Sequence, residues 1–144
     1  MFWFVLTLCA VCLASCEKTT DVNEMIDLTG GGYFTVFCID NTNGLTITRL
    51  TLKGKSFQTI DAHRGNIVRI RFVPDEKYES YSFDTKFILP TNTVINNQEE
   101  YEYAVPESLE GSYLVRLNAN SSGQDESHVW NIGVSDDFTL NIIQ

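Results

Sequence analysis

Four tyrosines with acidic neighbours are the side chains of this sequence best suited to binding a ligand. They are Tyr78, Tyr81, Tyr101 and Tyr103, and the acids around them are Glu79, Glu99, Glu100 and Glu102. An aromatic ring offers flat apolar contact to a sugar, and a carboxylate accepts hydrogen bonds from sugar hydroxyl groups. The cluster therefore predicts a polysaccharide-binding surface. Because Tyr101 and Tyr103 are spaced like two residues on one face of a strand, structural packing is the alternative.

The sequence carries no pattern typical of an enzyme. Its two histidines, His63 and His128, have no His, Cys or carboxylate at a spacing typical of zinc sites. No serine stands in a Gly-x-Ser-x-Gly motif, and adjacent acids such as Asp136 and Asp137 would point to opposite faces of a strand. We therefore expect no catalytic residues and no enzymatic activity.

Calcium is the one cofactor that the sequence leaves open, although the principal expectation is that no cofactor is bound. Acidic loops at one end of a domain can bring hard oxygen ligands together without a sequence motif. The acids in question are Asp75, Glu76, Asp125, Glu126, Asp136 and Asp137. The spacing of an EF-hand is missing, so the alternative is that these acids are solvated charges of surface loops. No individual residue is predicted to be a metal ligand.

The charge of the chain excludes nucleic acid as a partner. The formal net charge is −9, whereas phosphate-binding proteins need a surplus of Lys and Arg. The cations of the first half of the domain are nevertheless grouped, and they are Arg49, Lys53, Lys55, Arg64, Arg69 and Arg71. Most acids follow residue 74, so cross-strand ion pairs are expected, and a basic patch for a partner is the alternative.

The N-terminus predicts export and lipid attachment. Residues 1–14 contain no charged side chain, and this apolar run has the length of a signal peptide rather than of a membrane-spanning helix. It ends in Leu13-Ala14-Ser15-Cys16, which resembles the lipobox of bacterial lipoproteins. The resemblance implies that residues 1–15 are removed and that Cys16 carries the lipid. The alternative is that residues 1–15 form a buried strand.

Residues 16–32 are polar and acidic and end in three glycines, which predicts a flexible tether. This layout is similar to that of small lipoproteins of the Bacteroidota, some of which carry acids after the lipidated Cys. The similarity implies an outer-membrane location, anchored by lipid, on the cell surface or facing the periplasm. The membrane is thus one expected partner.

Residues 33–144 predict one all-β domain. Apolar residues recur there with period two, and Gly, Asn, Asp and Pro break the runs. The clearest strands cover 67–72, 113–119, 130–134 and 138–142, and less regular ones cover 33–39, 45–52, 56–60, 81–89 and 101–105. Turns are predicted at 43–44, 53–55, 121–123 and 136–137, and a bulge around Thr48 and Arg49. Seven to nine short strands favour a two-sheet antiparallel sandwich, with a closed barrel as the alternative.

Residues 110–123 give this sandwich a family resemblance. They read EGSYLVRLNANSSG, which is similar to the penultimate-strand signature of immunoglobulin-like sandwiches of the PKD type, Gly-x-Tyr-x-Val-x-Leu followed by Asn-x-x-Gly. The resemblance implies that Tyr113 is a corner tyrosine, with its ring packed inward and its hydroxyl bonded to nearby backbone.

Together these features predict a membrane-anchored binding, adhesion or accessory module of the cell envelope, without catalytic activity. A polysaccharide or an envelope protein would be its partner. The alternative is a structural scaffold subunit of an envelope assembly with no small-molecule ligand.

Overall fold

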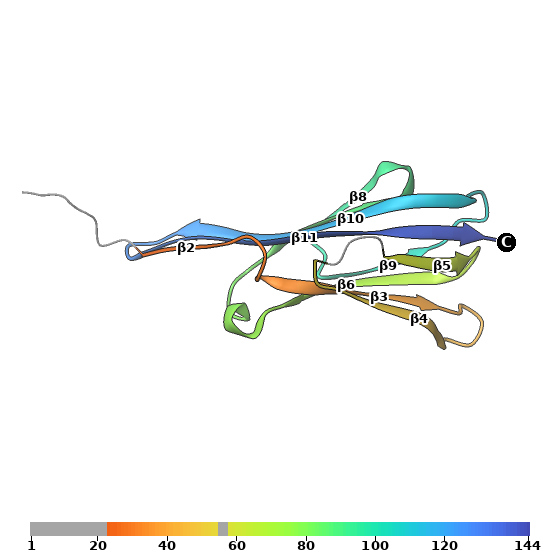
Figure 1. Cartoon of the computed structure of the whole chain (residues 1–144), viewed down its shortest axis with the longest axis horizontal. Coiled ribbons are helices and arrows are strands. Elements are labelled where there is room, and N and C mark those ends of the chain that lie inside the picture. The colour runs from red at the N-terminus through yellow and green to blue at the C-terminus, as the bar shows by residue number, and fades with distance from the viewer. Residues whose placement is uncertain (1–22, 55–57) are drawn as a thin grey trace, which may run out of the picture.

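The computed structural model describes residues 23–54 and 58–144, which form two β-sheets packed face to face (Figure 1). The predicted all-β, two-sheet sandwich is therefore confirmed, and its ten strands in the described residues exceed the predicted seven to nine. The predicted signal peptide, Cys16 and the tether as far as residue 22 lie outside the described residues. No helix within the described ranges is long or apolar enough to span a membrane.

The six-stranded sheet is built around one long hairpin. Its order is β2 (Asn23–Asp27), β11 (His128–Ile143), β10 (Gly111–Gln124), β7 (Asp84–Leu89) and β8 (Thr93–Asn96), with β5 (Thr59–His63) also paired to β11. β10 and β11 pair antiparallel without a break in register, whereas β2 and β5 each run parallel to β11. The hairpin extends beyond the other sheet, toward the end of the molecule where β2 lies (Figure 1).

The four-stranded sheet is antiparallel throughout. Its order is β4 (Thr46–Leu52), β3 (Gly32–Ile39), β6 (Ile67–Pro74) and β9 (Glu100–Ala104). The register of β3 and β4 shifts where Cys38 faces Thr48 and Ile39 faces Thr46. This irregularity lies one residue before the predicted bulge. Two short 3-10 helices, η2 (Glu76–Tyr78) and η3 (Pro90–Asn92), lie in the connections.

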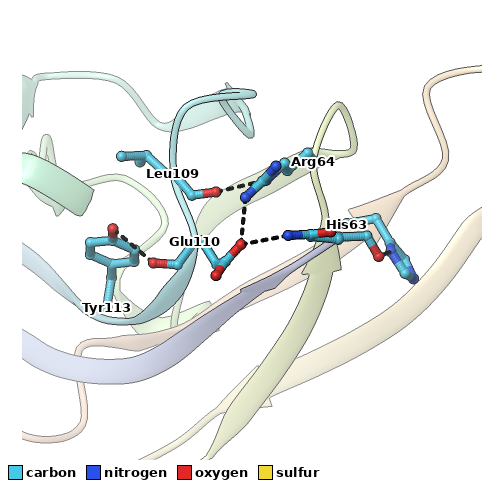
Figure 2. Close-up of polar contacts among 6 residues, drawn as sticks. His63, Arg64, Leu109, Glu110 and Tyr113 are labelled. Atoms are coloured by element: carbon cyan, nitrogen blue, oxygen red, sulfur yellow. Dashed lines mark hydrogen bonds and ion pairs between the residues drawn. The ribbon is translucent and has the colours of Figure 1, made fainter.

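The topology of residues 59–144 is immunoglobulin-like. The neighbours β7, β10 and β11 match strands C, F and G, and the pair β6 and β9 matches strands B and E. Tyr113 packs against the core, and its hydroxyl donates to the carbonyl of Glu110 at 3.1 Å, as Figure 2 shows. The predicted corner tyrosine is confirmed. Arg64 fixes the same corner by donating to Leu109 O (3.0 Å) and to the carboxylate of Glu110 (2.6 Å).

The core lies between the sheets and contains the alternate apolar residues of the strands. Phe34, Phe72 and Phe87 meet there, with the rings of Phe34 and Phe72 5.3 Å apart. The free thiol of Cys38 is also fully buried in the core, and burial raises its pKa. Such a thiol behaves as a small apolar side chain rather than as a nucleophile.

Several predicted boundaries are wrong. The strand predicted at 56–60 runs to His63, the strand predicted at 81–89 begins at Asp84, and two of the predicted turns lie inside strands. The ranges 130–134 and 138–142 belong to one strand, because β11 pairs with β10 through Asp136 and Asp137 without interruption. The turn predicted at 121–123 lies inside β10, and the hairpin turns instead at Asp125. There the Asp125 carboxylate accepts hydrogen bonds from the backbone N–H of Ser127 (2.8 Å) and His128 (2.7 Å), which closes the turn.

The tether prediction is also wrong for residues 23–27, which form β2. The long β11 leaves a free edge beyond β5, and β2 pairs with it from His128 to Ile132. Ile26 is 69% exposed on this short edge strand. The segment therefore does not need the alternation of apolar and polar residues by which a strand is recognised in a sequence.

Candidate functional site

The structure separates the four predicted ligand-binding tyrosines into two pairs. Tyr101 and Tyr103 lie on β9 and face the opposite sheet. Tyr103 is only 9% exposed, and Tyr101 packs against the core. Their rings are therefore part of the interior, which is the packing alternative, and they do not line a site with the other two tyrosines.

Tyr78 and Tyr81 lie in the connection between β6 and β7, next to the far end of the hairpin. Their ring centroids are 5.7 Å apart at 87°, and the ring of Tyr81 meets that of Trp130, on β11, at 5.7 Å and 75°. Tyr78 is buried, whereas Tyr81 is half-buried and its hydroxyl contacts the sulfur of Met25 at 3.5 Å. The three rings form a continuous aromatic wall.

Tyr78 connects the aromatic wall to β2 through a hydrogen bond. Its hydroxyl donates to Asp27 Oδ2 at 2.7 Å, and Asp27 also accepts a hydrogen bond from the backbone N–H of Gly30 at 2.6 Å. The hydrogen bond from Tyr78 is the main cause that lowers the pKa of Asp27, and the same bond raises the pKa of Tyr78 to about 12. At neutral pH the pair is thus a neutral phenol bound to a carboxylate.

A pocket of about 490 Å³ opens between the loop after η2 and the end of the hairpin. We call it the hairpin pocket, and it is lined by Ser80, Tyr81, Ser82, Ser121, Ser122, Asp125, His128 and Trp130. One wall is aromatic, and most other lining groups are hydroxyls. The pocket thus combines flat apolar contact with many hydrogen-bonding groups.

Trp130 is held in place by the strand opposite. It faces Gly123 in the register of β10 and β11, and its indole N–H donates to Ser121 Oγ at 3.2 Å. A Cβ atom on Gly123 would lie 2.5 Å from Trp130 Cζ2, closer than atoms can approach. Position 123 must therefore be glycine for the indole to lie across the neighbouring strand.

Ser127, His128 and Asp125 of the hairpin turn do not have the geometry of a catalytic triad. Ser127 Oγ lies 2.9 Å from His128 Nδ1, and Asp125 Oδ1 lies 3.4 Å from the same nitrogen. In a catalytic triad the serine and the carboxylate contact opposite nitrogens of the imidazole. Hydrogen bonds from the backbone N–H of Ser127 and His128 lower the pKa of Asp125, which keeps its carboxylate charged.

The acids considered for calcium are not gathered at one place in the described residues. In residues 23–54 and 58–144 no group of three or more His, Cys, Asp or Glu side chains is placed to hold a metal ion. Asp125 has other contacts, because its Oδ1 closes the hairpin turn.

Sequence reasoning missed Trp130 and the serines of the pocket. Trp130 reads as one more apolar strand position, and only its pairing with Gly123 shows that the ring lies on the neighbouring strand. Comparison with known proteins adds no further assignment, since no protein-family model, curated protein or solved structure matches the chain. What the hairpin pocket binds is therefore inferred from its own side chains.

Proposed function

We propose that the chain is a binding module without catalytic activity and that its hairpin pocket holds one or two units of a polysaccharide. The observation that carries the proposal is the pair of rings, Tyr81 and Trp130, set at 75° beside a group of serine hydroxyls. A pyranose ring has apolar C–H faces, which stack on aromatic rings, and a rim of hydroxyls, which need hydrogen-bond partners. The pocket supplies both.

The size and charge of the pocket favour a neutral saccharide. Its volume of about 490 Å³ falls within the usual range of small-molecule sites. The Asp125 carboxylate is ionised and accepts strong hydrogen bonds from hydroxyl groups, but it repels acidic sugars. Neutral hexoses therefore suit this site better than uronic acids.

We further infer that lipid on Cys16 holds the module on the outer membrane. Cys16 precedes the first residue of β2, Asn23, by seven positions, a distance of at most about 25 Å for an extended chain. Asn23 pairs with His128, which lines the hairpin pocket. A lipid at Cys16 would therefore keep the pocket close to the membrane that anchors it.

A glycan array of neutral saccharides tests the binding proposal. The chain from residue 17 onward is compared with Tyr81→Ala and Trp130→Ala, which each remove one ring of the pocket. Tyr101→Ala is the matched control, because it removes a half-buried ring from the other sheet. We expect the pocket variants to lose binding and the control to keep it. A wild-type chain that binds no glycan would favour the scaffold alternative.

Metabolic labelling with a palmitate analogue tests the anchor. We expect label in the wild-type protein and none in Cys16→Ser. Equal labelling of the two, or no labelling of either, would contradict the assignment of Cys16.

A further inference from the structure

The outer face of the four-stranded sheet carries three cations among partly exposed aromatic rings. Arg49 lies on the edge strand β4, and Lys53 is the first residue after that strand. Arg71 lies on β6, and Phe37 and Tyr33 lie on β3, between β4 and β6. We call these five residues the basic face. It lies in a different sheet from the hairpin pocket.

Contacts within the sheet hold two of these cations over the rings. The guanidinium carbon of Arg49 lies 5.5 Å from the ring centroid of Phe37, and Lys53 Nζ lies 4.7 Å from that of Tyr33. Cation–π contacts of this kind orient the charge without neutralising it. Both cations therefore remain available to an anion above the sheet.

The acids of β9 form their ion pairs with a different arginine, although Glu100 faces Arg71 in the register of β6 and β9. Arg69 pairs with Glu102 at 2.7 Å and with Glu100 at 3.4 Å. Within the described ranges, no carboxylate lies within the 4.0 Å ion-pair distance of Arg49, Lys53 or Arg71. The basic face thus keeps a local positive charge on a chain whose net charge is −9.

The register gives the spacing of the three charges. Arg71 and Arg49 are separated by strand β3, so their strands lie about 10 Å apart. Lys53 lies four residues after Arg49, just past the end of β4, which is about 13 Å for extended backbone. Thr35 lies between the two rings on β3, and its side chain is buried. Charges spread over these distances suit an extended polymer better than a small ion.

We propose that the basic face binds an acidic polysaccharide whose repeating carboxylate or sulfate groups pair with Arg49, Lys53 and Arg71. A guanidinium binds such planar or tetrahedral oxyanions through two parallel hydrogen bonds. The rings of Tyr33 and Phe37 hold the charges of Lys53 and Arg49 in place for such a ligand. The inference is independent of the hairpin pocket, because the two sites share no residue and favour opposite ligand charge.

Binding to immobilised polygalacturonate tests the proposal, with the full-length protein in a neutral detergent and dextran as the uncharged polymer. The test variant is Arg49→Gln/Arg71→Gln. The matched control is Lys86→Gln/Arg116→Gln, which removes two exposed cations from the six-stranded sheet and changes the net charge equally. We expect the test variant to bind roughly tenfold more weakly, as two lost charge-assisted contacts imply, and the control to bind like wild type.

Binding should also weaken with added salt and persist in Trp130→Ala, which separates it from the hairpin pocket. Equal losses in the two charge variants would overturn the proposal, because net charge alone would then explain the attraction. No binding of wild type to polygalacturonate would overturn it as well. Stronger binding to anionic phosphatidylglycerol vesicles or to DNA than to polygalacturonate would replace the polysaccharide with a lipid surface or a nucleic acid.

Discussion

Replacing Gly123 with Ala tests how the hairpin pocket holds its tryptophan. The new methyl group would lie 2.5 Å from Trp130 Cζ2, where ordinary contacts begin at 3.4 Å. The indole must therefore retreat by about 1 Å or turn away, since the backbone of β10 is fixed by its pairing with β11. Either movement strains the hydrogen bond to Ser121 and the contact with Tyr81.

The change in the free energy of unfolding caused by Gly123→Ala is the sum of two opposing effects. Overpacking costs about 1–3 kcal/mol, whereas exchanging a strand glycine for alanine gains about 0.5–1 kcal/mol from the lost freedom of the unfolded chain. We expect Gly123→Ala to lower the free energy of unfolding by about 0.5–2 kcal/mol. In the Trp130→Ala background the overlap is gone, and the same change should be neutral or stabilising. Urea unfolding followed by circular dichroism measures all four chains of this cycle.

The difference between the two backgrounds is the coupling energy of Gly123 and Trp130. We expect about 1–3 kcal/mol, within the range for residues in direct contact. An equal effect of Gly123→Ala in both backgrounds would refute the reasoning, because the glycine would then serve the backbone and not the indole.

Three further predictions concern side chains that stabilise the fold or are buried in its core. Tyr78→Phe should cost about 1.5–3 kcal/mol at pH 7, the value of a hydrogen bond to a charged group. Because the pKa of Asp27 is lowered in the folded state, the stabilisation by this hydrogen bond is fully present above pH 3.8, the ordinary pKa of the carboxyl group, and should be lost as the pH falls through the folded-state pKa. Urea unfolding of wild type and Tyr78→Phe at pH 7 and pH 2.5 measures the loss. A cost of Tyr78→Phe that is the same at both pH values would contradict the pairing. Tyr113→Phe should cost about 0.5–1.5 kcal/mol in the same assay, and no loss would show that the corner hydroxyl contributes nothing. In the chain from residue 17 onward, Cys38 is the only cysteine, and iodoacetamide should label it only on unfolding; rapid labelling of the native chain would contradict its burial.

The sequence predicts the strands whose two faces differ in polarity. In β6, Val68, Ile70 and Phe72 are buried while Arg69 and Arg71 point outward, as the alternation indicates. Such a pattern can be recognised from neighbouring residues alone, because alternate side chains of a strand point to opposite faces, one buried in the core and one exposed to water. The alternation does not show which tyrosines belong to a site. Of the four predicted tyrosines only Tyr81 lines the hairpin pocket, whereas Tyr78 and Tyr103 are buried and Tyr101 packs against the core.

Features set by the partner strand could not be predicted. Asp136 and Asp137 predict a turn because acids are rare in strands. In the structure they belong to β11, which pairs with β10 without interruption. Asp136 also accepts a hydrogen bond from the backbone N–H of Gly54 at 2.7 Å. The hairpin pocket likewise joins Tyr81 to Trp130, which are distant in sequence. Only the register and the packing of the loop on the hairpin bring them together.

A tryptophan fluorescence titration tests the central claim most directly, because Trp130 is the only tryptophan in the chain from residue 17 onward. We predict that a neutral oligosaccharide bound in the hairpin pocket changes the emission of Trp130 with saturation and that Tyr81→Ala weakens this binding. An oligosaccharide that binds the chain without changing the emission of Trp130, or with equal affinity for Tyr81→Ala, would contradict the claim that these two rings form the binding site.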